Sequence, residues 1–383
     1  MSTAIRNRLD EKLQSLQQAS PERIGQVVHV VLAEAVRCSA SDVHFEPTHR
    51  ALEVRYRIDG VLQHVATLAK DVAPNIVARL KVLADLLTYR LDVPQEGRLA
   101  TATSEFGVDM RVSTFPTIHG EKAAVRIFEA SERTLDLEQL GLPDDLRAEW
   151  TRLLLERTGA LFLTGPSGSG KTTTIYACLR YLVQQSGGGR HIVTIEDPVE
   201  QVLEGVSQAQ VRPGTEFDFA RGLRSLLRQD PEIIMIGEVR DPQTARTAIE
   251  AALTGHLVFS SLHAGSSCGV VGRLLDMGVE PYLLTSGLKG ILNQRLVRRL
   301  CPACRRTEGC PQCAGTGYHG RLLLAELLTL DASLRRAILD KSDTAQLEAI
   351  AHETGRWTLA SQAAHAVAQG WTSRREIERV LGP

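Results

Sequence analysis

The chain has 383 residues, more than one core of ordinary size accommodates, so its length predicts two domains. Its 44 lysines and arginines are balanced by 45 aspartates and glutamates, which excludes a globally basic protein built around nucleic acid. The N-terminus lacks the apolar core of a signal peptide, and no apolar run approaches the ~20 residues that span a bilayer, so a cytoplasmic protein is expected.

The first part of the chain is predicted to form a small α+β domain. Residues 1–20 are expected to be a short amphipathic helix or tail, with one face carrying Ile5, Leu9, Leu13 and Leu16. Residues 21–130 combine helical stretches with strand-like runs, including a hairpin that turns at Asp59-Gly60. Residues 131–148 are rich in charge and are predicted to be a linker.

Residues 149–383 have a different pattern, in which short apolar runs alternate with helical segments. The runs are ALFLTG (160–165), HIVTIED (191–197), EIIMIGE (232–238) and LVFSSLH (257–263). This alternation predicts βαβ units and a mainly parallel sheet that is buried on both faces. Residues 331–383 are predicted to be helical, and the sequence indicates no function for them.

A complete phosphate-binding motif, GPSGSGKT, lies at residues 165–172 between a predicted strand and a predicted helix. Its glycines allow backbone N–H groups to point at phosphates, Lys171 would reach the β- and γ-phosphates of ATP, and Thr172 would hold Mg²⁺. A glycine-rich structural turn is the alternative. The predicted nucleotide-binding residues are Gly165, Pro166, Ser167, Gly168, Ser169, Gly170, Lys171, Thr172 and Thr173.

Carboxylates follow two of the downstream strands. Glu196 and Asp197 end one strand, and Glu238 ends another, with Asp241 just beyond it. Ligands of open α/β sheets bind at the carboxyl ends of the strands. Hydrolysis needs one carboxylate beside Mg²⁺ and another that orients or deprotonates water. The alternative is that each carboxylate is solvated and caps the next turn.

Two CxxC pairs separated by five residues make up the segment CPACRRTEGCPQC, residues 301–313. In a reducing compartment this pattern favours a metal over disulfides, and four thiolates suit a closed tetrahedral Zn²⁺ site with a structural role. Redox or free-thiol chemistry is the alternative. The predicted zinc ligands are Cys301, Cys304, Cys310 and Cys313.

Several blocks together resemble the type II secretion and type IV pilus assembly ATPases. They include GPSGSGKTTTIYA, VTIEDPVE, LRSLLRQDPEIIMIGEVRD and TARTAIEAALTGHLVFSSLHA, with SDVHFEP, RYRIDG and PQEGR upstream. The resemblance covers roughly residues 24–327. It implies an α/β fold: a RecA-like P-loop NTPase domain with a mainly parallel sheet, preceded by a small PAS-like α+β domain and carrying a small zinc-binding insert.

The resemblance also implies roles for residues outside the phosphate loop. Glu196 would be the general base and Glu238 the carboxylate on the Mg²⁺ side, although the two could exchange roles. His256 and His263 would sense the γ-phosphate. Basic residues of one protomer would face the nucleotide of its neighbour, with Arg98 and Arg111 as the candidates and Arg126 as a weaker one. Three arginines at helical spacing stay unassigned: Arg221, Arg224 and Arg228.

The resemblance implies a motor that uses ATP, Mg²⁺ and Zn²⁺. It would be a homo-oligomer, a hexameric ring that drives pseudopilin or pilin assembly and protein secretion from the cytoplasmic face of the inner membrane. An inner-membrane platform protein would be its partner, and membrane association would be peripheral. The resemblance is to a short form of the family, in which the first N-terminal domain is expected to be missing, and the four cysteines favour an assembly motor over a retraction motor.

Other functions stay open at this point. A type IV pilus or competence pseudopilus motor would have the same motifs. A nucleic-acid translocase is a second alternative, although the 4% of aromatic residues and the near-neutral charge argue against nucleic acid as a partner. A slow nucleotide-dependent scaffold is a third, and Lys171, Thr172, Glu196 and Glu238 argue against it.

Overall fold

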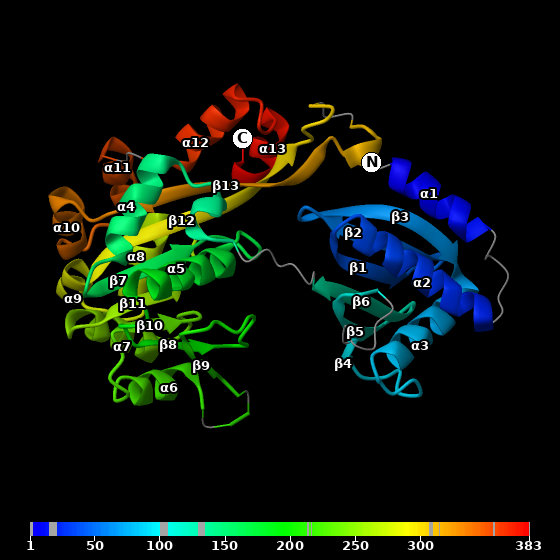
Figure 1. Ribbon diagram of the computed structural model, residues 1–383, viewed down its shortest axis with the longest axis horizontal. Coiled ribbons are helices and arrows are strands. Elements are labelled where there is room, and N and C mark those ends of the chain that lie inside the picture. The colour runs from blue at the N-terminus through cyan, green and yellow to red at the C-terminus, as the bar shows by residue number, and fades with distance from the viewer. Residues whose placement is uncertain are drawn as a thin grey trace. The chain divides into compact units, whose positions relative to one another are not determined.

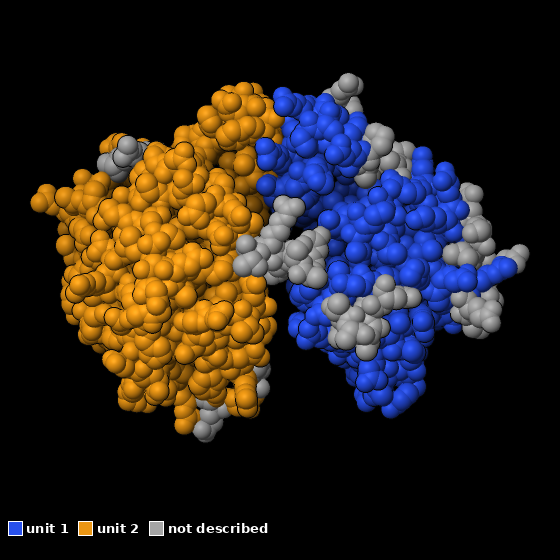
Figure 2. Space-filling view, in the orientation of Figure 1, with its two compact units in different colours: residues 1–133, 298–321 blue, residues 134–297, 322–383 orange. Residues whose placement is uncertain are grey.

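The computed structural model describes residues 3–14, 21–99, 106–128, 135–212, 214–215, 217–305, 309–313, 315–354 and 357–382. The chain divides into two compact units, coloured separately in Figure 2. The first comprises residues 1–133 and 298–321, and the second residues 134–297 and 322–383. The sequence assigned the cysteine segment to the ATPase domain, whereas it groups here with the N-terminal unit. One contact within that unit is a hydrogen bond from Gly320 N–H to the Asp59 carboxylate (3.1 Å).

The first unit is built on a six-stranded sheet in which every recorded pairing is antiparallel. Its order is β3-β2-β1-β6-β5-β4 (Figure 1). The strands are β1 (Ala40–Pro47), β2 (Ala51–Ile58), β3 (Val61–Ala69), β4 (Gln95–Leu99), β5 (Asp109–Thr117) and β6 (Gly120–Phe128). In β2, alternate side chains are buried, as expected for a strand with one face on the core. The predicted turn is confirmed: Asp59 and Gly60 both have positive φ, as a two-residue hairpin requires.

Helices pack apolar side chains against this sheet and against one another. They are α1 (Thr3–Gln14), α2 (Pro21–Arg37), the short η1 (Lys70–Val72) and α3 (Ala73–Leu83). The predicted stripe on α1 is confirmed in part, because Ile5, Leu9 and Leu13 are buried. Leu16, the fourth member of the stripe, and residues 131–134 of the predicted linker lie outside the described residues.

The second unit contains a seven-stranded sheet in the order β13-β12-β7-β11-β10-β8-β9 (Figure 1). Its strands are β7 (Gly159–Thr164), β8 (Ile192–Glu196), β9 (Ser207–Gln210), β10 (Ile233–Ile236), β11 (Leu257–Ser261), β12 (Leu288–Leu300) and β13 (Tyr318–Leu328). The pairs from β12 through β9 are parallel. The carboxyl ends of β7, β8, β10 and β11 therefore meet at one edge of the sheet.

Helices cover both faces of this sheet, so alternate side chains of each strand enter different cores. Ala160 and Phe162 of β7 join one core, and Leu161 and Leu163 join the other. The helices are η2 (Leu137–Leu140), α4 (Asp144–Leu154), α5 (Lys171–Ser186), α6 (Phe219–Leu226), α7 (Pro242–Leu253), α8 (Ser267–Asp276), α9 (Pro281–Gly287), α10 (Ala332–Leu339), α11 (Thr344–Thr354), α12 (Leu359–Ala368) and α13 (Arg374–Leu381). The short η3 (Pro311–Cys313) belongs to the cysteine segment of the first unit. Among the described helices, none is long and apolar enough to cross a membrane.

Trp150 on α4 provides a test of this packing. Its side chain is fully buried, and its indole N–H donates to the Cys178 sulfur at 3.3 Å. We expect Trp150→Ala to lower the free energy of unfolding by about 3–5 kcal/mol, because it leaves a large cavity. Urea unfolding followed by circular dichroism measures the change. Trp371→Ala is the matched control, since that ring is 39% exposed; equal losses for the two variants would contradict the assignment of Trp150 to the core.

Candidate nucleotide and metal sites

The phosphate loop runs from the end of β7 to the start of α5. The loop glycines with positive φ are Gly165, Gly168 and Gly170. A Cβ atom at Gly165 would lie 2.4 Å from the Gln294 carbonyl oxygen on the neighbouring β12, so a side chain does not fit there. The glycine pattern of the motif therefore follows from backbone conformation and from the close approach of β12.

Lys171 lies inside the curve of this loop. Its ammonium group donates to the carbonyl oxygens of Gly165 (2.8 Å) and Pro166 (3.0 Å). Burial lowers the pKa of Lys171, Glu238 opposes that shift, and Arg295 adds to it. The ammonium group thus has two neutral acceptors and one nearby carboxylate, and an anionic phosphate would provide the charge that the loop carbonyls lack.

A pocket of about 420 Å³ adjoins the start of the loop. It is lined by Gly165, Pro166, His263, Ala264, Gly265, Gly269 and Arg273. Two contacts hold the segment that follows His263: the Thr164 hydroxyl donates to the Ala264 carbonyl (3.2 Å) and accepts from its N–H (3.1 Å), and Arg295 donates to the Gly265 carbonyl (2.8 Å). His263 is thereby placed beside the phosphate loop.

The two predicted carboxylates lie at the carboxyl edge of the sheet in different environments. Glu196 is buried and accepts hydrogen bonds from Tyr176, from Thr194 (2.5 Å) and from Gln208 (3.1 Å). Glu238 is partly exposed and forms an ion pair with Arg240. The negative charge of Glu238 raises the pKa of Lys171, against the effect of burial. Asp241 has a structural role as N-cap of α7.

His256 lies at the other edge of the same sheet. It precedes β11, whereas His263 follows that strand, so the length of β11 separates them. The His256 ring nitrogen Nδ1 is hydrogen-bonded to the Ala251 carbonyl (3.0 Å). The fold therefore places only His263 beside the phosphate loop of its own chain. Thr172 and Thr173 are exposed on the first turn of α5, next to Lys171.

The candidate arginines belong to the first unit, where they form one row. Arg98 on β4 lies opposite Arg111 on β5, which lies opposite Arg126 on β6. Directly opposed residues project from the same face of a sheet, so the three guanidinium groups share one face. All three are exposed, and each forms an ion pair with an acidic residue: Asp109, Glu96 and Asp42, respectively. This alignment follows from strand register, which the motifs did not specify.

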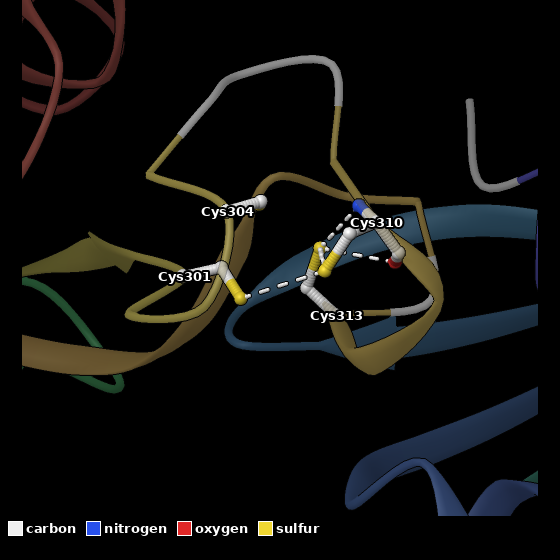
Figure 3. A group of neighbouring side chains, drawn as sticks. All are labelled: Cys301, Cys304, Cys310 and Cys313. Carbon is white, nitrogen blue, oxygen red and sulfur yellow. Dashed lines mark hydrogen bonds between the residues drawn. The ribbon is translucent and has the colours of Figure 1, made fainter.

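The four cysteines converge, as the spacing predicts. Their sulfur atoms all lie within 4.8 Å of one another, and Figure 3 shows the sulfurs of Cys301, Cys310 and Cys313 facing one another. Cys310 Sγ is 4.0 Å from Cys301 Sγ and 3.8 Å from Cys313 Sγ. Tetrahedral Zn²⁺ with ligands at about 2.3 Å requires sulfurs roughly 3.8 Å apart. The donor set therefore fits zinc.

The surroundings of Cys313 favour a thiolate. Burial by itself raises the pKa of Cys313, but hydrogen bonds from the N–H groups of Cys310 (3.1 Å) and Gly317 (3.3 Å) outweigh it and lower the pKa to about 7. A thiolate is the form that binds metal. No other group of three or more potential metal ligands occurs within the described ranges.

Removing one cysteine tests the metal centre. We expect Cys304→Ser to lose bound zinc and to lower the melting temperature. The free energy of zinc binding at a structural site, on the order of 10 kcal/mol, contributes directly to the stability of the fold. Elemental analysis and thermal unfolding measure both effects. Cys38→Ser is the control, since Cys38 lies outside the cluster. Full zinc content in the Cys304 variant, or none in the wild type, would contradict the assignment.

Sequence motifs missed several residues that shape the nucleotide site. Arg295 and Thr164 hold the segment after His263, and Tyr176 and Gln208 contact Glu196. A signal was present for two of them. Thr164 ends an apolar strand, and Arg295 belongs to a polar run, residues 293–295, that interrupts another apolar strand. Buried polar groups in such strands need hydrogen-bond partners, so both positions indicated a contact.

A mainly parallel sheet with helices on both faces, and a glycine-lysine loop between its strand β7 and helix α5, define a RecA-like P-loop NTPase. The family model described as "Type II/IV secretion system protein" matches residues 17–379. The chain belongs to this family. The family assignment confirms the fold class and the ATPase class that the sequence predicts.

Individual relatives agree with the family assignment. The type II secretion system ATPase E of Vibrio cholerae serotype O1 is 39% identical over 378 residues, which are 92% of this chain and 74% of that protein. The type II secretion system protein E of Pseudomonas aeruginosa is 38% identical over 401 residues, covering 98% and 79%. A crystal structure of the pilus retraction motor PilT with bound ADP superposes with a TM-score of 0.61 at 27% identity, covering 90% of this chain and 94% of that one.

Proposed function

We propose that the chain is an ATP-hydrolysing motor of a type II secretion system. The observation that carries the proposal is the burial of Lys171 inside the glycine-rich phosphate loop. Glu196 and Glu238 lie at the same edge of the sheet as this loop. This combination provides a cation for the phosphates and two carboxylates of unlike environment. The relatives named type II secretion system proteins support the choice of system.

In the proposed reaction, water loses a proton to Glu196 and its oxygen bonds to the γ-phosphorus. The bond to the bridging oxygen breaks, and its electron pair remains on ADP. Lys171 stabilises the charge on the phosphoryl group, and His263 contacts the same group from the pocket side. Thr172 and Glu238 would hold Mg²⁺, which supplies further positive charge when bound.

The proposed working form is a hexameric ring on the cytoplasmic side of the inner membrane, held there by an inner-membrane platform protein. The arginine row supports a shared site. Arg98, Arg111 and Arg126 are exposed on one face of the first unit, so another copy of the chain could bring its phosphates to them. The cargo would be pseudopilins, and Zn²⁺ at the four cysteines would be structural.

Phosphate release by purified protein tests this proposal. We expect ATP turnover that requires Mg²⁺, is unchanged by single-stranded DNA, and occurs in particles of about six chains by light scattering. Stimulation by single-stranded DNA that declines steeply with salt would instead support a nucleic-acid translocase. Nucleotide binding without turnover would support a scaffold.

A further inference from the structure

We propose that Tyr176 is a positioning residue that fixes Oε2 of Glu196 relative to Lys171. The inference deepens the proposed function and rests on it for its catalytic consequence. Tyr176 lies on α5, five residues after Lys171, and is 4% exposed. Its hydroxyl group donates to Glu196 Oε2. The same hydroxyl oxygen lies within hydrogen-bond distance of the N–H groups of Glu200 (3.2 Å) and Gln201 (3.4 Å).

Counting acceptor positions shows why one oxygen of Glu196 differs from the other. A carboxylate has about four acceptor positions, two on each oxygen. Thr194 (2.5 Å) and Gln208 (3.1 Å) both donate to Oε1 and occupy its two positions. Tyr176 donates to Oε2 and occupies one. Among the residues that the structure describes, Oε2 therefore keeps one acceptor position open, so we assign it as the oxygen that takes the proton from water, and the Tyr176 hydroxyl group sets its direction.

The phenol of Tyr176 connects the phosphate loop, where Lys171 lies, with the carboxylate of Glu196. Lys171 begins α5, so Tyr176 is about 7.5 Å farther along the same axis. Glu196 ends β8, and the two N–H groups at Glu200 and Gln201 belong to the segment after it. The hydroxyl thus ties the helix that starts at the phosphate loop to the carboxylate and to the segment that follows it.

Tyr176 is suited to be a permanent donor. Burial raises its pKa, and the hydrogen bond to Glu196 raises the pKa further. The phenol therefore stays protonated through neutral pH. Its ring packs in the same core as Trp150 and Leu179, so a phenylalanine would keep the packing and remove only the hydroxyl group.

Kinetics of Tyr176→Phe test the inference. We expect kcat for ATP hydrolysis to fall about 10- to 100-fold while KM is unchanged, because a small displacement of a reacting group has effects of this size. In a Glu196→Gln background the same change should cause no further loss. Tyr181→Phe, on the same helix, is the control and should retain wild-type kcat. Thr194→Val, which removes a donor from Oε1, should have the smaller effect.

An unchanged kcat, or an equal loss in the presence and absence of Glu196, would overturn the inference. A second measurement does not depend on turnover. Urea unfolding of Tyr176→Phe, Glu196→Gln and the double variant, without nucleotide, should give midpoint shifts that are not additive. If wild-type protein failed to hydrolyse ATP, the proposed function would fail, and additive midpoint shifts would separately overturn the Tyr176 contact.

Discussion

Lys171→Ala is expected to lower kcat/KM for ATP by on the order of 10²–10³, because it removes a preorganised cation from the phosphate loop. The two loop carbonyls that accept from the ammonium group would lose their donor but keep their backbone. We therefore expect the variant to fold. Binding of a fluorescent ADP analogue and steady-state phosphate release measure the loss of binding and of turnover.

Lys289→Ala is the matched control for this prediction. Lys289 lies near the start of β12, and Leu288 beside it pairs with Ala160 at the start of β7, away from the phosphate loop. The control should retain wild-type turnover and ADP binding. If both lysine variants lost activity equally, the loss would reflect general damage to the second unit, and the role assigned to Lys171 would be wrong.

Glu196→Gln and Glu238→Gln are expected to fail in different ways. A glutamine cannot accept the proton from water, so Glu196→Gln should lower kcat by roughly 10²–10⁴ and leave the Mg²⁺ requirement unchanged. Glu238→Gln should also raise the Mg²⁺ concentration needed for half-maximal turnover, since it removes the carboxylate that we propose holds Mg²⁺ together with Thr172. Titrating Mg²⁺ at saturating ATP distinguishes the two.

Glu250→Gln is the control for both carboxylates, because Glu250 is on α7 and pairs with Arg246 at 2.8 Å. If the Mg²⁺ shift appeared in the Glu196 variant and not in the Glu238 variant, the two roles would be exchanged. If neither variant changed kcat, the scaffold function would replace the motor.

The local parts of this architecture could be predicted from the sequence. The Asp59-Gly60 turn, the loop at residues 165–172 and the two cysteine pairs each occupy a few consecutive residues, and glycine, lysine and thiolate chemistry restricts what they can do. The parallel sheet followed from the alternation of apolar runs and helical segments.

The parts that sequence patterns did not supply depend on contacts between distant residues. The Gln294 carbonyl oxygen lies close to Gly165 because the strand order places β12 next to β7. The arginine row requires the register of β4, β5 and β6, and no pattern in a single strand specifies register. The position of His256 away from the phosphate loop requires the strand direction of β11.

Turnover in mixed particles tests the central claim, a ring motor with coupled sites, most directly. Lys171→Ala chains are mixed with wild-type chains at fixed total protein, reassembled together, and checked for mass by light scattering. We predict that activity falls faster than the wild-type fraction in particles of about six chains, because the sites depend on one another. A strictly linear fall, or a monomeric mass with nucleotide present, would contradict the ring.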